Sequence, residues 1–437
     1  MIGIVVSRAD EASSHIGDFL CELADWEVTE DSTVDPAAGG GTVRRTKQFE
    51  LRTFDGLHIE LEGAADTFSE LNALVFASRH SGETGPLLTA HFTGNPGEAE
   101  FGGQPGRLAR AWPAGLAQIL ESLGTAAPQG YDVGIECTHH GPTDLDVPSM
   151  FVEVGSADAQ WRDPAAAEAV AQAILSLEAR RCGDRTIVGF GGGHYAPRFG
   201  RIVRETDWAV GHILADWGLE ELQSDRPAMF EQVFDRSGAR LAVIDGDRPA
   251  LADEIESLGY RVVSETWVRE TTGVALDLVN RLEGRLCSVD DGLRFGDRVA
   301  EVDDVWIYEP PADLLEDLHG IDPAATKRAV ASNTAAFETI ENGNRIQGRV
   351  ALPSDRSTGG LIEAIIPVLE TKYDAVERSD GTLLVRERAF DPARARDLGV
   401  PEGPAFGQLS SGEPVEVGTE TVTPEMVHTE RERRYRL

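Results

Sequence analysis

Lysine is nearly absent from this chain of 437 residues, which contains only Lys47, Lys327 and Lys372. Arginine therefore supplies almost all of the positive charge, and 40 basic residues stand against 75 acidic ones, for a net charge of -35. The acidic residues are scattered over the whole chain and do not form a tail. Dispersed acidic charge with little lysine predicts adaptation to very high salt, where self-repulsion is screened. It also argues against general RNA binding, because affinity for polyanions requires local lysine or arginine.

Cysteine and long apolar runs are scarce as well. The four cysteines, Cys21, Cys137, Cys182 and Cys287, lie far apart and include no CxxC pair, which predicts reduced thiols and no disulfide framework. No run approaches the ~20 apolar residues of a membrane helix, and the N-terminus has no basic segment typical of a signal peptide. We therefore expect a soluble, cytoplasmic protein without a membrane partner, and as a first hypothesis a monomer.

Short apolar runs are abundant, and many alternate with helical segments. The runs that predict strands are 2–6, 74–77, 131–135, 150–154, 186–188, 240–244 and 260–263. This alternation predicts an α/β fold with a mainly parallel or mixed sheet and helices on both faces. The length favours two domains. Because the character of the sequence changes near Gly284, we predict a catalytic domain at 1–284 and a smaller C-terminal domain at 285–437.

Two local predictions concern histidines outside the main motifs. The segment 208–217 is predicted as a helix that carries His212, which we expect to be either a packed or a surface residue. Strands 43–52 and 57–61 are predicted to form a hairpin around an Asp-Gly pair, a strong turn signal. His58 would then lie on this hairpin, away from any site.

The stretch 134–156 holds the densest set of chemically active side chains. A predicted strand ends at Ile135 and is followed by Glu136, and then by His139 and His140 before a Gly-Pro pair stops it. The next predicted strand carries Glu153 between apolar neighbours. Charged groups at the end of a sheet are costly to bury unless they are paired or bound to a metal. This stretch is therefore predicted to form a functional site.

Other predicted strands also deliver histidines near their ends. His80 follows one apolar run, His91 lies in the next, and His194 follows a third run and the glycines 191–193. In open α/β sheets, ligands bind outside the carboxyl ends of the strands. We therefore predict that these three histidines converge with His139 and His140.

Each candidate in the central motif has a structural alternative. Adjacent residues of an extended segment point in opposite directions, so one of His139 and His140 is expected to face the site and the other to support it. By the same reasoning, at most one of Glu136 and Cys137 points into the site. Cys137 by itself is more often a core residue than a ligand.

The remaining candidates also allow two interpretations. Glu153 can act at a metal or as a base, or it can form a buried salt bridge with Arg79. The glycines 191–193 can form a backbone nest that holds an anion, or an ordinary tight turn. Histidine, thiolate and carboxylate groups together suit zinc, but HExxH and other compact ligand spacings are missing. A metal-free site with one histidine as general base is therefore the alternative chemistry.

Five motifs together resemble one known family. They are Ala77-Ser-Arg-His80, the segment 91–95 (HFTGN), the segment 136–142 (ECTHHGP), the segment 153–156 (EVGS) and the segment 189–197 (GFGGGHYAP). In this order they resemble the archaeal type of D-aminoacyl-tRNA deacylase, and the resemblance extends over about 1–282. The resemblance does not cover the rest of the chain, which we expect to be a lineage-specific extension.

The resemblance implies a hydrolase that cleaves the ester between a D-amino acid and the 3′-terminal adenosine of tRNA, and so keeps D-residues out of translation. It also implies zinc as the cofactor, a fold similar to peptidyl-tRNA hydrolase, and an origin in a halophilic archaeon. With this reaction in view, three residues are assigned to catalysis: His140, His194 and Glu153. Four are assigned to the metal: His80, His91, His139 and Glu136. Five are assigned to substrate or tRNA binding: Arg79, Gly191, Gly192, Gly193 and Arg198.

Two other functions stay open at this point. A zinc hydrolase of small esters or amides would not depend on the tRNA part of the substrate. A non-catalytic RNA-binding module would retain aminoacyl-tRNA without turnover, although the acidic composition argues against it.

Overall fold

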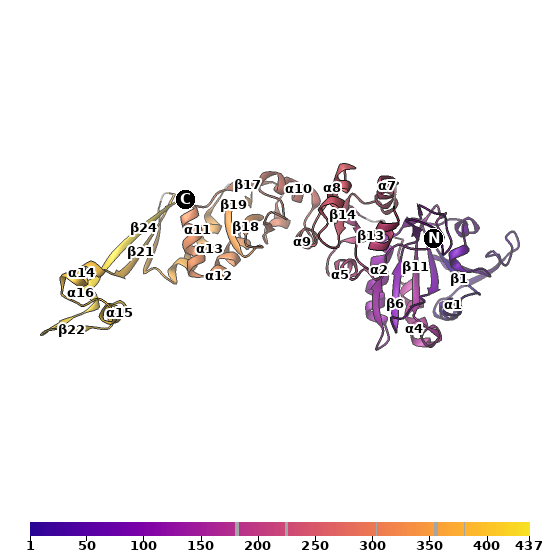
Figure 1. Ribbon diagram of the computed structural model, residues 1–437, viewed down its shortest axis with the longest axis horizontal. Helices are drawn as coiled ribbons and strands as arrows, with labels where there is room; N and C mark the ends of the chain where they lie inside the picture. Colours follow the sequence, from indigo (N-terminus) through magenta and orange to yellow (C-terminus); the bar gives the residue numbers. More distant parts are fainter. Residues whose placement is uncertain (180–182, 223–225, 303, 354–356, 380) are drawn as a thin grey trace. The chain divides into compact units, whose positions relative to one another are not determined.

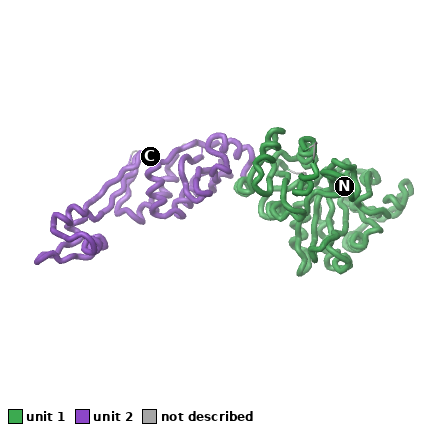
Figure 2. Tube along the Cα trace, in the orientation of Figure 1, with its two compact units in different colours: residues 1–272 green, residues 273–437 purple. Residues whose placement is uncertain are grey.

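The computed structural model describes residues 1–179, 183–222, 226–302, 304–353, 357–379 and 381–437. The chain forms two compact units, 1–272 and 273–437 (Figure 2). The predicted boundary at Gly284 falls within α10 (Leu276–Arg285), which belongs to the second unit. Cys182 lies outside the described residues, whereas Cys21, Cys137 and Cys287 are free thiols. No helix in the described ranges has the length and apolar character needed to cross a bilayer.

A nine-stranded sheet forms the centre of the first unit (Figure 1). Its main path is β10 (Asp132–Ile135), β6 (Leu87–His91), β11 (Pro148–Gly155), β5 (Ala73–Arg79), β1 (Ile2–Ser7), β4 (Phe49–Phe54), β3 (Gly41–Arg45) and β2 (Glu27–Asp31), and β9 (Arg110–Ala111) pairs with β11. The pairs β10–β6, β11–β5, β5–β1, β1–β4 and β11–β9 are parallel, and the others are antiparallel. The prediction of a mainly parallel or mixed sheet is confirmed.

Helices of the first unit pack beside this sheet. They are α1 (Glu11–Leu23), α2 (Pro113–Ala126) and α4 (Pro164–Leu175), with the short α3 (Asp158–Trp161) between strand β11 and α4. Asp10 is the N-cap of α1 and accepts a hydrogen bond from the Ser13 N–H at 3.0 Å. Since α4 contacts both α1 and α2, the three long helices form one layer.

A second, four-stranded parallel sheet completes the first unit. Its order is β13 (Ala209–Leu214), β12 (Thr186–Phe190), β14 (Leu241–Ile244) and β15 (Arg261–Val262). The helices of this part are α5 (Pro197–Glu205), α6 (Asp216–Glu221), α7 (Arg226–Ser237), α8 (Pro249–Ser257) and α9 (Glu265–Glu270). Two short strands, β7 (Gly94–Asn95) and β8 (Arg107–Leu108), pair separately.

The helix predicted at 208–217 is wrong, because this segment forms β13. Val210, His212 and Leu214 are as buried as the residues between them, so the strand shows no alternation of apolar and polar residues. A short, fully buried strand cannot be told from a buried helix by periodicity. Of the two alternatives for His212, packed or at the surface, the structure shows the first, with 0% of its surface exposed.

The predicted hairpin is also misplaced. Strands β3 and β4 form it, and the turn lies at 46–48, because Thr46 N–H donates to the Phe49 carbonyl. The segment 58–60 is a 3₁₀ helix, η1 (His58–Glu60). His58 is only 2% exposed and its Nε2 lies 3.2 Å from Ser13 Oγ, so it is a core residue and not a surface one. A second 3₁₀ helix, η2, spans Ala64–Thr67.

The second unit contains antiparallel sheets. One has the order β16 (Leu293–Phe295), β18 (Ala336–Ile340), β19 (Arg345–Pro353) and β17 (Val305–Tyr308), and another has β20 (Ala375–Ser379), β21 (Thr382–Phe390) and β24 (His428–Arg436). A small hairpin joins β22 (Val415–Val417) and β23 (Glu420–Val422). The helices after α10 are α11 (Ala312–Ile321), α12 (Pro323–Ala331), α13 (Gly359–Glu370), α14 (Pro392–Asp397), α15 (Pro404–Ser410) and α16 (Pro424–Val427), and η3 (Val299–Glu301) is a 3₁₀ helix.

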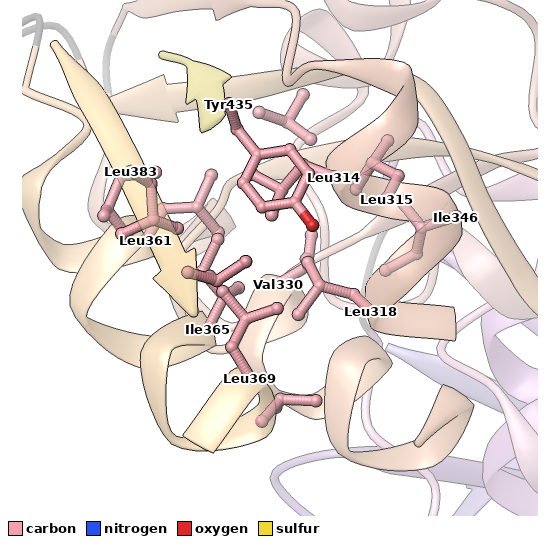
Figure 3. Close-up of a cluster of buried hydrophobic side chains, with 14 of the residues drawn as sticks. Leu314, Leu315, Leu318, Val330, Ile346, Leu361, Ile365, Leu369, Leu383 and Tyr435 are labelled. Carbon is pink, nitrogen blue, oxygen red and sulfur yellow. The ribbon is translucent and has the colours of Figure 1, made fainter. Parts of the chain in front are cut away.

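The second unit has its own hydrophobic core. Leu314 and Leu318 of α11 pack with Ile365 of α13 and with Tyr435 of the last strand (Figure 3). The ring of Tyr435 is 1% exposed, and its hydroxyl donates a hydrogen bond to Asp317. This core ties the C-terminal strand to α13 and to α11, which lies more than a hundred residues earlier in the chain.

We expect Leu318→Ala to destabilise the second unit by about 2–5 kcal/mol, because the fully buried side chain leaves a cavity. Hydrogen exchange of the α11 and α13 amides would measure this loss of free energy. Leu398→Ala is the matched control, since Leu398 is 38% exposed. Equal losses of protection in both variants would contradict the packing of Leu318.

Candidate functional site

The segment that follows β10 joins the two sheets of the first unit. The N–H of Cys137 donates to the His194 carbonyl at 2.7 Å, and the N–H of Thr138 donates to the Ile213 carbonyl at 2.9 Å. Both acceptors belong to the second sheet or to the turn after it. The histidines of this segment are therefore carried to the place where strand ends of both sheets meet.

Thr138 is fixed further by His212. The Thr138 hydroxyl lies 2.9 Å from His212 Nδ1, and His212 Nε2 lies 2.9 Å from the Ala109 carbonyl. Since Nε2 then carries the proton, Nδ1 accepts from the hydroxyl. Burial lowers the pKa of His212 to about 4, so the ring stays neutral. His212 of the second sheet thus holds the segment after β10 in place through Thr138.

The five motif histidines lie together, as their positions at strand ends predict. The ring centroid of His139 is 4.1 Å from that of His91, 4.4 Å from that of His140 and 4.6 Å from that of His194. His80 contacts this group of rings through Glu136, because Glu136 Oε2 lies 3.7 Å from His80 Nε2.

In the part of the chain that the structure describes, three sets of ligand atoms lie close enough to hold a metal ion, with all atoms of a set within 4.8 Å of one another. The sets are His91, His139 and His140; Cys137, His139 and His194; and His80, Glu136 and His194. They share His139 and His194, so they form one continuous centre.

The first set has the hydrogen bonding expected of metal ligands. Nδ1 of His91, His139 and His140 lies 3.2, 2.8 and 2.7 Å from the backbone carbonyls of residues 92, 137 and 141. A neutral ring that donates from Nδ1 keeps the lone pair of Nε2 for a metal. Burial holds the pKa of His139 and His140 well below the usual range, so both rings are neutral.

Unpartnered atoms also support the fit. Within the described part of the chain, His91 Nε2 and Glu136 Oε1 are buried and have no hydrogen-bond partner. Burying such atoms without a partner is costly. Imidazole, thiolate and carboxylate donors match zinc, so these residues fit the metal that the family resemblance implies.

Glu136 and His194 form the shortest of the ion pairs described in the site, with Glu136 Oε2 2.6 Å from His194 Nε2. Burial raises the pKa of Glu136, but the hydrogen bond with His194 and the surrounding imidazoles outweigh it and hold this pKa below its usual value. Burial in turn lowers the pKa of His194, but Cys137 and Glu136 raise it to about 10. In this arrangement the carboxylate is ionised and His194 carries a proton.

Glu153 faces His91 from the neighbouring strand. Its Oε1 lies 3.6 Å from His91 Nε2, beyond hydrogen-bond distance. Burial raises the pKa of Glu153 to about 7, and Glu153 in turn raises the pKa of His91 against the effect of burial. Glu153 therefore lies beside His91 and not in a salt bridge with Arg79, whose guanidinium lies over the Trp161 ring.

Two expectations about side-chain direction are wrong. The rings of His139 and His140 do not diverge, since both lie beside His91. His140 has φ +42°, and this left-handed backbone breaks the alternation of an extended chain. Glu136 and Cys137 both contact His194, with Cys137 Sγ 3.6 Å from His194 Nδ1, because β10 already ends at Ile135.

The predicted substrate-binding residues lie in different surroundings. Arg79 stacks over the Trp161 ring at 5.1 Å. Arg198 forms ion pairs with Asp245 at 3.1 Å and with Glu265 at 3.7 Å.

In the glycine turn, the N–H of Gly191 already donates to the Leu214 carbonyl at 2.7 Å. A Cβ on Gly192 would come within 2.6 Å of an Asp245 carboxylate oxygen, so the turn lies against an acidic group. Glycine is required at both positions, since their φ angles are +86° and +81°.

Two further residues of the site were not predicted. Ser156 Oγ lies 3.0 Å from His80 Nδ1, and Tyr195 Oη lies 3.3 Å from His80 Nε2. Both residues lie within motifs of the sequence analysis. Ser156 ends the motif that begins with Glu153, and Tyr195 follows His194 in the motif 189–197. Their position in those motifs was the available signal.

Comparison with known proteins identifies the family. The family model for D-aminoacyl-tRNA deacylase matches residues 67–263, which include every predicted site residue. A D-aminoacyl-tRNA deacylase of Natronomonas pharaonis is 52% identical over 100% of both chains. The chain belongs to the D-aminoacyl-tRNA deacylase family.

Two other members of the family are similar to this chain over its whole length. The D-aminoacyl-tRNA deacylase of Halorubrum lacusprofundi is 50% identical over 100% of this chain and 96% of its own, and that of Haloarcula marismortui is 48% identical over 100% of both. These halophilic archaeal relatives accord with the dispersed acidic charge. The second unit is thus shared with them.

A solved structure is similar to part of this chain. The crystal structure of a conserved protein of unknown function is 28% identical, with a TM-score of 0.57, and the match covers 63% of this chain and 99% of that one.

Proposed function

We propose that the histidine centre hydrolyses the ester bond between a D-amino acid and the 3′-terminal adenosine of tRNA. The products are the free D-amino acid and tRNA, so the reaction removes D-residues before translation. The enzyme would act in the cytoplasm as a monomer, with the first unit as its catalytic part. The observation that carries this proposal is the convergence of five imidazoles, Cys137 and two carboxylates at the meeting point of two sheets, in a chain of this family.

We further propose that His91, His139 and His140 hold zinc. Their Nδ1 atoms are engaged by backbone carbonyls, which leaves three Nε2 atoms for the metal. Bound zinc supplies a Lewis acid that polarises the ester carbonyl and lowers the pKa of water. This proposal makes His140 a metal ligand and not a catalytic residue. It does not use His80 and Glu136 as ligands of this metal, because they lie beside His194 in a separate set.

His194 is the residue we assign to proton transfer. Its side chain is 36% exposed, against 20% for His139 and 5% for His80, so it is open to substrate. Glu136 orients it through the 2.6 Å hydrogen bond. A protonated imidazole held in this way can donate a proton to the ribose oxygen when the ester bond breaks.

Glu153 is better described as a positioning residue than as a catalytic one. It lies beside His91 on the neighbouring strand and its side chain is only 4% exposed. Arg79 remains the proposed contact for a tRNA phosphate, because its paired group is an aromatic ring and not a carboxylate. Arg198 would have to leave two carboxylates to make the same contact.

The decisive experiment follows release of amino acid from D-tyrosyl-tRNA and L-tyrosyl-tRNA by the purified chain in high salt. We expect multiple turnovers on the D-ester and little on the L-ester. Digesting the tRNA away from the ester beforehand tests whether the RNA part is needed. Equal rates before and after digestion would indicate an esterase of small substrates, and binding without release would indicate an RNA-binding module.

A further inference from the structure

A cavity of about 390 Å³ lies at the free edge of the nine-stranded sheet. It is bounded by the edge strand β10, by β6 beside it and by the face of α5 that carries Pro197, Gly200 and Arg204. Its apolar lining comes from Leu87, Val133, Ile135 and Pro197. Its size and lining are typical of a pocket for a small organic group.

Two residues that line the cavity are chain neighbours of residues in the histidine centre. Ile135 directly precedes Glu136, and Tyr195, which lines the cavity, directly follows His194. The Tyr195 hydroxyl reaches His80 Nε2 at 3.3 Å. A group bound in the cavity would therefore lie next to the reacting bond.

The strand register places the cavity and the centre on the same face of the sheet. Gly134 of β10 pairs with Thr89 of β6, and Thr89 pairs with Glu153 of β11. Paired residues share a face, and so does His91, two residues after Thr89. Thr89 lines the cavity, is fully buried, and has no hydrogen-bond partner for its hydroxyl among the described residues.

We propose that this cavity receives the amino-acid side chain of the D-aminoacyl ester and sets a preference for bulky apolar side chains. The proposal rests on the deacylase function proposed above. The ester carbonyl belongs at the histidine centre, and the side chain is attached one carbon away from it. An apolar pocket that begins at residues adjoining Glu136 and His194 is therefore in reach of the side chain.

Gly134 gives the test, because a Cβ added there meets no atom within 4 Å. Gly134→Val should fill the cavity from its wall without disturbing the fold, since valine suits a strand. We expect kcat/KM for D-tyrosyl-tRNA to fall at least about 10-fold, the scale of a poor fit in an apolar pocket. Hydrolysis of D-alanyl-tRNA should not change. Gly134→Ala should have a smaller effect in the same direction, and it replaces valine if the valine variant does not fold.

The matched control is Gly124→Val, on α2 outside the cavity, where an added Cβ also meets no atom within 4 Å. It should leave both substrates unaffected. Equal loss on D-tyrosyl-tRNA and D-alanyl-tRNA in the Gly134 variants would overturn the proposal and assign the cavity to the terminal adenosine, which both substrates share. No loss on either would also overturn it. Failure of the unmodified chain to hydrolyse either ester would instead reject the deacylase function, and this proposal with it.

Discussion

Removal of metal from the purified full chain is expected to reduce hydrolysis of D-tyrosyl-tRNA to the uncatalysed rate. The reason is that His91, His139 and His140 hold their Nδ1 atoms at backbone carbonyls and leave three Nε2 atoms for a cation, an arrangement that offers no nucleophile of its own. The measurement is release of amino acid after treatment with a chelator and dialysis into high salt. Metal analysis of the same samples gives the zinc content before and after.

Reconstitution supplies the control for this prediction. Adding zinc to the stripped protein should restore turnover, whereas adding magnesium should not, because magnesium prefers oxygen ligands and this centre is built mainly of nitrogen and sulfur. Circular dichroism should show that the stripped protein is still folded. Full activity in protein shown to contain no metal would reject the metal centre and favour a histidine acting as general base.

The strands of the first unit could be predicted because they are short apolar runs with clear ends. The run 74–77 lies within β5, and the run 150–154 lies within β11. The error at 208–217 has a physical cause, since β13 is buried on both faces and its sequence carries no period. The hairpin error arose because the Asp-Gly pair turns the chain toward a 3₁₀ helix and not toward a second strand.

Convergence of the histidines could be predicted, but the rule that the carboxyl ends of parallel strands meet at one edge explains only part of it, because β6 and β10 run antiparallel to β5 and β11. The individual directions of the side chains could not be predicted. His140 has a left-handed backbone, and Glu136 and Cys137 lie beyond the end of β10, so the alternation of a strand does not apply to any of them. The hydrogen bond between His212 and Thr138 joins the two sheets of the first unit. It could not be predicted, because the sequence of a strand does not show which other sheet the strand contacts.

The separate roles proposed for His140 and His194 lead to the other large expected effect. His140→Ala should lower both the zinc content and the turnover of D-tyrosyl-tRNA, because one of three Nε2 ligands is removed. His194→Ala should retain zinc but lower turnover by about 10²–10⁴-fold, the usual cost of losing a group that transfers a proton. Affinity for the uncharged tRNA should change little in either variant, since neither side chain is assigned to the tRNA.

His58 is unsuitable as the control for this pair, because it is buried against Ser13 and Asp10. His15→Ala is a better choice, since His15 lies outside the cluster on α1 and only part of it is buried. It should preserve both zinc content and turnover. Retention of zinc by His140→Ala with loss of turnover would return His140 to proton transfer. Normal turnover in both site variants, with folding verified by circular dichroism, would mean that the cluster is structural and that the chemistry occurs elsewhere.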